Sequence, residues 1–154
     1  MSDPINIHAS CVAIGNKGVL FLGKSGAGKS DLALRLIDGG AKLVADDRVL
    51  LFGKSGAIHA RAPDTIRGLL EIRGVGIVEL PVRRQVRLAL AVVLGSEGPR
   101  LPEPKFWHPP APLRMNTKLP QITLDARYAS APAKIRAVLA AFAQKAFRDN
   151  FNLK

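Results

Sequence analysis

The sequence is poor in cysteine and in aromatic residues. Cys11 is its one cysteine, so no internal disulfide can form, and its apolar neighbours predict a buried, inert thiol. There is one Trp and one Tyr, and no basic run is longer than Arg83-Arg84. Proteins that bind single-stranded nucleic acid usually interleave aromatic stacking platforms with Lys and Arg. We therefore expect no nucleic-acid partner.

Long apolar runs are lacking as well. No stretch approaches the ~20 uninterrupted apolar residues that span a bilayer, and the chain does not open with a basic segment followed by an apolar run. The sequence thus predicts a soluble, unprocessed, cytoplasmic protein with no membrane partner. Its 154 residues can bury a real core without disulfide or metal support, so we predict a single domain over 1–154.

Acidic residues are scarce: 12 Asp and Glu stand against 23 Lys and Arg. The excess is uneven, with a net charge of +1 over residues 1–50, +4 over 51–100 and +6 over 101–154. Such a field attracts nucleic acid, anionic membrane or an acidic protein, and charge alone does not choose among them.

The apolar pattern predicts an α/β fold that is rich in strands. A β-prone segment at 5–14 should form a hairpin with 19–23 through the turn GNKG. Leu32, Leu36 and Ile37 recur at helical spacing, which predicts a helix over 29–38 that ends at Gly39-Gly40. Further strands are expected at 42–47, in a second hairpin turned at 53–56, and at 69–80, 86–94 and 118–126.

Proline marks the last third of the chain. Residues 99–112 carry six prolines, which exclude helix and central strand there, so an exposed loop is expected over about 98–118. An amphipathic C-terminal helix should follow, begun by Ser130 and Pro132. Its apolar face would carry Ile135, Val138, Leu139, Phe142 and Phe147.

Residues 23–30 read GKSGAGKS and match the phosphate-loop pattern G-x-x-x-x-G-K-[ST] between a predicted strand and a predicted helix. Glycines let backbone N–H groups converge on phosphate oxygens, and the helix N-terminus adds partial positive charge. In this pattern Lys29 reaches the β- and γ-phosphates and Ser30 can ligate Mg²⁺. We therefore predict a nucleotide cradle made by Gly23, Lys24, Ser25, Gly26, Ala27, Gly28, Lys29 and Ser30.

Three further side chains are expected near the phosphates. Asp46 and Asp47 end a strand whose carboxyl end should open beside the phosphate loop, so that one carboxylate could organise a metal through water and the other could act as a base. His8 would lie in the strand that the hairpin pairs with 19–23, and could reach the same edge. A histidine in an apolar strand is also commonly a core residue.

In order and spacing, His8, GKSGAGKS (23–30), LVADDRV (43–49) and LEIRGVGIVEL (70–80) resemble the catalytic domain of HPr kinase/phosphorylase. This bacterial enzyme phosphorylates a serine of the phosphocarrier protein HPr. LEIRGVGI is the most discriminating element, and the resemblance covers about residues 5–95. It implies a phosphate-loop fold, ATP and Mg²⁺ as cofactors, HPr as partner, and a regulatory role in the phosphotransferase system and carbon metabolism.

The resemblance also implies residue roles. His8 and Lys29 would lie near the transferring phosphate, and Ser30 and Glu71 would bind Mg²⁺. Asp47 would accept the serine proton in the kinase direction and return one in the reverse direction, with Asp46 as its acidic neighbour. Arg73, Gly74 and Gly76 would shape the site.

Several features depart from the family pattern. Members usually carry a separate N-terminal domain, whereas this chain begins seven residues before His8, so a catalytic domain alone is expected. The partner-contacting arginine would be Arg100 in GPRLPEP, with Arg114 as the runner-up. The segment tied to dephosphorylation reads DARYASAP and keeps only Arg127 in register, which leaves the phosphorylase activity open.

The basic surface would then recruit the protein partner, with the Pro-rich loop and residues 131–150 as contact surfaces. The family's catalytic domains assemble into hexamers, so a homo-oligomer is expected. Two alternatives share the phosphate loop. One is a small-metabolite kinase, which would need an arginine-rich lid where 99–118 is proline-rich. The other is a non-enzymatic, nucleotide-dependent binding module.

Overall fold

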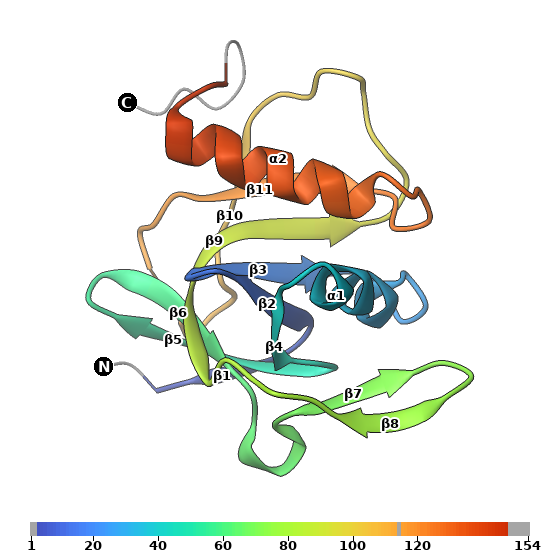
Figure 1. Cartoon of the computed structure of the whole chain (residues 1–154). Coiled ribbons are helices and arrows are strands. Elements are labelled where there is room, and N and C mark those ends of the chain that lie inside the picture. Colours follow the sequence, from blue (N-terminus) through green and yellow to red (C-terminus); the bar gives the residue numbers. More distant parts are fainter. Residues whose placement is uncertain (1–2, 114, 148–154) are drawn as a thin grey trace.

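The computed structural model describes residues 3–113 and 115–147 of the chain. The described residues form two α-helices and one short 3₁₀ helix, and strands dominate the architecture (Figure 1). The elements, in chain order, are β1 (Ile5–His8), β2 (Ser10–Ile14), β3 (Lys17–Leu22), α1 (Lys29–Asp38), β4 (Lys42–Ala45), β5 (Arg48–Lys54), β6 (Ala57–Arg61), the 3₁₀ helix η1 (Asp64–Ile66), β7 (Leu69–Ile72), β8 (Gly76–Glu79), β9 (Gln85–Leu94), β10 (Lys105–Trp107), β11 (Leu119–Leu124) and α2 (Ala131–Gln144).

Strand β9 joins the parts of the main sheet. Its first residues pair antiparallel with β6, and from Leu88 on it pairs parallel with β3. Its last four residues also pair parallel with β11. The main path runs β1-β5-β6-β9-β3-β2-β4, and β10 pairs with β11 at the far side. Because β3 and β9 run in the same direction, the carboxyl ends of both strands open toward the segment 23–28.

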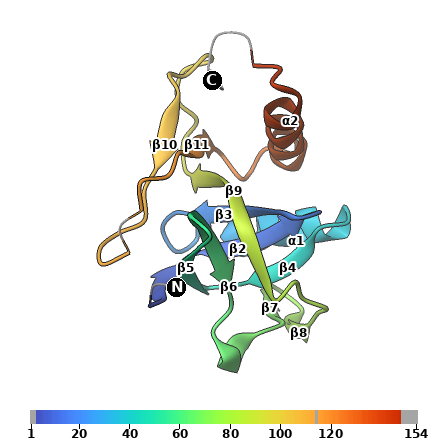
Figure 2. The same cartoon turned by 90° about the vertical axis from the view of Figure 1, so that its left-hand side faces the viewer.

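The two faces of the sheet bury different partners. Val19 and Phe21 of β3 face a core shared with α1 and α2, whereas Leu20 between them faces a second core that β5 and β6 complete. Figure 2 shows both helices on the same side of the sheet. On α1 the buried residues are Lys29, Leu32, Ala33 and Leu36, and on α2 they are Ala131, Ile135 and Leu139.

Many local predictions are confirmed. The helix at 29–38 and the strand at 86–94 are present, as α1 and most of β9. Cys11 is fully buried, and burial raises the pKa of its thiol, which keeps it protonated and inert. The Pro-rich stretch contains only the short β10 at the edge of the sheet. None of the helices in the described ranges is long and apolar enough to cross a membrane.

Two strand predictions are wrong. Residues 5–14 form two strands instead of one, because Ala9 interrupts the strand. Strand β2 pairs with β3 as expected, but β1 pairs with β5. Residues 69–80 form a hairpin of two strands, β7 and β8, turned around Arg73 to Val75. The glycines at 74 and 76 have positive φ and allow the chain to reverse where we predicted one continuous strand.

The C-terminal helix is confirmed, with a shorter apolar face than we predicted. Helix α2 ends at Gln144, and Lys145 follows in the left-handed conformation. Phe147 is therefore outside the helix, where its ring lies 4.9 Å from that of Phe142 between centroids.

Candidate functional site

The phosphate loop connects β3 to α1, as the motif requires. Gly23, Gly26 and Gly28 all have positive φ, at 153°, 84° and 99°. At Gly28 a Cβ would also come within 2.9 Å of the Cβ of Ala126. Glycine is thus needed at Gly28 for both its backbone conformation and its packing. The loop leads directly into the N-terminus of α1, where backbone N–H groups favour an anion.

Lys29 is buried at the first position of α1. Its Nζ donates hydrogen bonds to the carbonyl oxygens of Gly23 at 2.7 Å and Lys24 at 3.0 Å, so the ammonium group lies inside the curve of the loop. Burial lowers the pKa of Lys29, and the nearby carboxylates of Asp47 and Asp46 act in the opposite direction. The ammonium group and both carboxylates therefore share one site.

Asp46 is the buried carboxylate of this site. It is 7% exposed, and its Oδ1 accepts hydrogen bonds from Ser30 Oγ at 2.7 Å and from Ser10 Oγ at 2.8 Å. The contact with Ser30 links the end of β4 to the first turn of α1. Two hydroxyl donors compensate the cost of burying this carboxylate.

Asp47, unlike Asp46, has an exposed side chain that lies beside His8. Its backbone is left-handed, with φ of 68°, which is uncommon for a residue other than glycine. The side chain is 72% exposed, and its Oδ1 lies 3.2 Å from Nε2 of His8, which is 37% exposed. The backbone N–H of Ala9 also donates to the carbonyl oxygen of Asp47. Two adjacent carboxylates are thereby separated into one buried and one accessible group.

The oxygens of Ser30 and Asp46 suit Mg²⁺, which prefers hard oxygen ligands and usually keeps water and substrate phosphates in its shell. No group of three or more His, Cys, Asp or Glu side chains in the described ranges could hold a metal ion by itself. Ser30 and Asp46 therefore fit a metal that the phosphates of a bound nucleotide would also ligate.

Glu71 lies on the β7–β8 hairpin. Strand β7 contacts α1 and its Leu70 is fully buried, whereas Glu71 is exposed. Arg73, Gly74 and Gly76 are exposed at the turn of this hairpin, which lies apart from the main sheet in Figure 1. The structure brings His8, Lys29, Ser30, Asp46 and Asp47 together, and it shows no contact of Glu71 with them among the described residues.

The structure describes only one of the two arginines that the sequence proposed as partner-contacting. Arg100 is exposed in the segment that follows β9, whose last residue, Leu94, lies against Gly23. Arg114 lies outside the described residues.

The turn after β11 packs against the phosphate loop, where Ala126 lies beside Gly28. Arg35 of α1 donates hydrogen bonds to the carbonyl oxygens of Ala126 and Tyr128 and to Asp31. Arg127 in the same turn binds both carboxylate oxygens of Asp125. These contacts hold Ala126 beside Gly28.

The sequence interpretation missed Ser10 and Arg35. Ser10 is fully buried within an apolar strand, and a buried hydroxyl needs a partner, which was an available signal. The role of Arg35 gave no such signal, because the two carbonyl oxygens that it binds near the phosphate loop are more than 90 residues away.

Comparisons with known proteins agree with this arrangement. Residues 1–88 match the family described as "HPr Serine kinase C-terminal domain". Proteins named HPr kinase/phosphorylase are similar to this chain. The one from Leptothrix cholodnii is 44% identical over 114 residues, covering 64% of this chain and 35% of that protein. The one from Bordetella pertussis is 42% identical over 102 residues, covering 61% and 33%. The chain thus spans about a third of the length of these relatives.

The fold has a solved counterpart. The structure of the Hpr(Ser) kinase/phosphatase from Coxiella burnetii matches with a TM-score of 0.75 and 24% identity, and the match covers 92% of both chains. The predicted α/β fold, with its helix after the phosphate loop and its C-terminal helix, is therefore confirmed. With more than half of its residues matched, the chain belongs to the HPr serine kinase C-terminal domain family.

Proposed function

We propose that this chain is an ATP- and Mg²⁺-dependent protein-serine kinase that transfers the γ-phosphate to a serine of an HPr-like phosphocarrier protein. One observation carries the proposal: Asp46 is buried on Ser30, whereas its neighbour Asp47 is exposed and contacts His8. The site thus separates a carboxylate suited to a metal from a carboxylate that a macromolecular substrate can reach.

The phosphate loop and Lys29 would bind the nucleotide. Lys29 Nζ now contacts two loop carbonyl oxygens, and phosphate oxygens would replace these as its partners. Ser30 and Asp46 would hold Mg²⁺, which supplies positive charge to the phosphate oxygens. The resemblance of the sequence to this family implies Glu71 as the second metal ligand, and we keep that role as a proposal for the substrate-bound state.

Asp47 would act as the base. The serine hydroxyl gives its proton to the Asp47 carboxylate as its oxygen forms the new bond to the γ-phosphorus, and the bond from phosphorus to the bridging oxygen breaks. His8, 3.2 Å from Asp47 Oδ1, would orient that carboxylate. Arg100, in the exposed segment that follows β9, would contact the partner.

The relatives' names motivate the choice of partner, and the net charge of +11 suits an acidic surface on it. We propose in addition a cytoplasmic location, assembly into a hexamer, and a regulatory role in the phosphotransferase system. The reverse reaction, release of the phosphate from phosphorylated HPr by inorganic phosphate, is a second activity to be tested.

The purified chain should transfer label from γ-labelled ATP to HPr in the presence of Mg²⁺. An HPr variant whose serines are replaced by alanine is the matched control and should stay unlabelled. Label on a small molecule with none on HPr would contradict the proposal, as would label on both HPr forms alike. Incubating labelled phospho-HPr with phosphate then tests the reverse reaction.

A further inference from the structure

A pocket of about 270 Å³ lies at the end of the sheet opposite the phosphate loop. Its lining comes from the turn and start of β6, from Arg87 and Leu88 of β9, and from residues 116–119 before and at the start of β11. Leu88 is paired with Gly18 at the start of β3, whereas the phosphate loop follows the other end of β3. In Figure 1 the β5–β6 turn and the phosphate loop lie on opposite sides of the molecule. None of the nucleotide-site residues lines this pocket.

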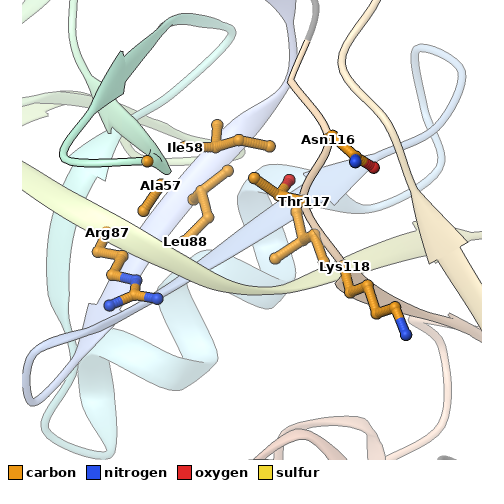
Figure 3. A pocket seen from close by; sticks show the side chains of 9 residues that line it. Ala57, Ile58, Arg87, Leu88, Asn116, Thr117 and Lys118 are labelled. Carbon is orange, nitrogen blue, oxygen red and sulfur yellow. The ribbon is translucent and has the colours of Figure 1, made fainter.

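The pocket combines two cations with a mostly polar surface that includes a few apolar side chains. Figure 3 shows Arg87 and Lys118 on opposite sides, with Leu88 and Thr117 between them. Ala57 and Ile58 are apolar and buried, and no carboxylate is among the lining residues. Neither Arg87 nor Lys118 contacts a carboxylate among the ion pairs of the described residues. Their two positive charges are therefore available to an anion.

Thr117 adds an independent signal. Its Oγ1 is buried and has no hydrogen-bond partner, the one such side-chain atom in the described part of the chain. Buried hydroxyls are usually hydrogen-bonded, and one that is not calls for an explanation. Since Thr117 lines the pocket, an acceptor oxygen bound there would take this hydrogen bond.

We propose that this pocket binds a short aliphatic dicarboxylate. One carboxylate would pair with Arg87 and the other with Lys118, and the Thr117 hydroxyl would donate to one of their oxygens. The carbon chain between them would pack on Leu88 and Ile58. A volume of about 270 Å³ is at the small end of ligand pockets, which suits a ligand of this size.

The separation of the two cations favours a dicarboxylate over inorganic phosphate. A phosphate ion needs several donors at one point, whereas Arg87 and Lys118 lie apart (Figure 3). The inference does not depend on the proposed kinase activity, because the pocket shares no residue with the nucleotide site.

Titration calorimetry on the full chain tests the proposal, with succinate and glutarate as probes. The single Trp supplies a second signal, because Trp107 pairs with the pocket residue Leu119. We expect saturable binding of at least one probe. Arg87→Gln and Lys118→Gln should each weaken it about tenfold, because each removes a charge-assisted hydrogen bond. Arg84→Gln, which removes an equal charge outside the pocket, should leave the affinity unchanged, and so should Lys29→Ala in the phosphate loop.

Thr117→Val keeps the side-chain shape and removes the hydroxyl. It should weaken probe binding several-fold without lowering the melting temperature of the free protein, since no hydrogen bond within the protein is lost. Absence of saturable binding would overturn the proposal. So would probe binding that Arg84→Gln weakens as much as Arg87→Gln, or that Lys29→Ala abolishes. Binding of phosphate but of neither dicarboxylate through Arg87 and Lys118 would overturn the assigned ligand class.

Discussion

Asp46 and Asp47 are chemically identical neighbours in different environments. Asp46 accepts two hydrogen bonds in the interior, from Ser10 and from Ser30. The left-handed backbone at Asp47 turns the neighbouring carboxylate away from them. Such a conformation costs free energy in a residue with a Cβ, and the hydrogen bond from Ala9 N–H to the Asp47 carbonyl helps to hold it. The result is an exposed carboxylate at a fixed place beside His8.

Replacing each aspartate by asparagine should give different defects. Asp47→Asn should lower phosphate transfer by about 10² to 10⁴-fold, because an amide cannot accept the serine proton, while ATP affinity stays close to that of the wild type. Asp46→Asn should weaken the Mg²⁺ dependence of ATP binding, because it removes the charge next to Ser30. Single-turnover transfer and ATP titrations with and without Mg²⁺ measure both effects. Equal loss of ATP affinity in the two variants would contradict this division.

Asp125 should titrate unusually low. The Arg127 guanidinium hydrogen-bonds both of its oxygens and holds the pKa of Asp125 at about 2, below its ordinary value near 3.8. Because the folded-state pKa is depressed, this pair stabilises the fold above the ordinary pKa, and the stabilisation is lost as the pH falls toward 2. Carboxyl chemical shifts of Asp125 measured by NMR against pH test this. Arg127→Gln should move the midpoint up toward the ordinary value, and an unchanged midpoint would rule out Arg127 as the cause.

At the scale of elements, the phosphate loop is shaped by packing against the turn after β11. Arg35 holds this turn through the carbonyl oxygens of Ala126 and Tyr128, and the Ala126 Cβ leaves no room for one at Gly28. The loop thus depends on a segment nearly 100 residues away in sequence.

A pair of variants can separate backbone strain from this contact. Gly28→Ala should destabilise the protein by about 2 kcal/mol or more, from the left-handed φ and from the clash with Ala126. Adding Ala126→Gly should recover only the clash. Urea unfolding of the wild type, both single variants and the double variant gives the coupling free energy. If the two changes were simply additive, the contact would have no energetic role.

Elements with strong local signals were predictable. The phosphate loop and α1 follow from the glycines and the spacing of Leu32 and Leu36, and each needs only neighbouring residues. The pairing of β1 with β5 was not predictable, since it joins Ile5 to Leu51 and leaves no trace in the local pattern. The hairpin at 69–80 was missed because its two glycines fit a bulged strand equally well.

The arrangement of the candidate site was predicted only in part, because it too depends on long-range strand pairing. His8 lies beside Asp47, but through β5 and the turn at Asp47, whereas we expected the hairpin with β3 to carry it there. In the structure Ser30 donates a hydrogen bond to Asp46, sixteen residues along the chain, and no sequence pattern specified this contact. The role of Glu71 as a Mg²⁺ ligand beside Ser30, which the family resemblance implies, stays a prediction. Which of two adjacent carboxylates is buried depends on a backbone angle that no residue pattern specifies.

At the scale of the whole molecule, charge should govern the encounter with a protein substrate. The chain carries a net charge of +11, most of it beyond residue 50. The ion pairs between its Arg or Lys and acidic side chains in the described ranges involve Arg35, Arg67, Arg127 and Lys134. A field of this sign raises the rate at which an acidic partner arrives, and salt screens it over a Debye length of about 8 Å at 0.15 M and about 3 Å at 1 M.

The second-order rate constant kcat/KM for HPr should therefore fall steeply with added NaCl. The rate of the transfer step itself, measured in a single turnover at saturating HPr, should change much less, because the reacting groups lie close together and are screened little. Sucrose at the same osmolarity is the control and should not reproduce the effect. Arg100→Gln should lower kcat/KM at low salt and make it less sensitive to salt, because it removes one exposed positive charge from the segment that follows β9. A kcat/KM that is independent of salt would show that shape, and not charge, brings the partner to this site.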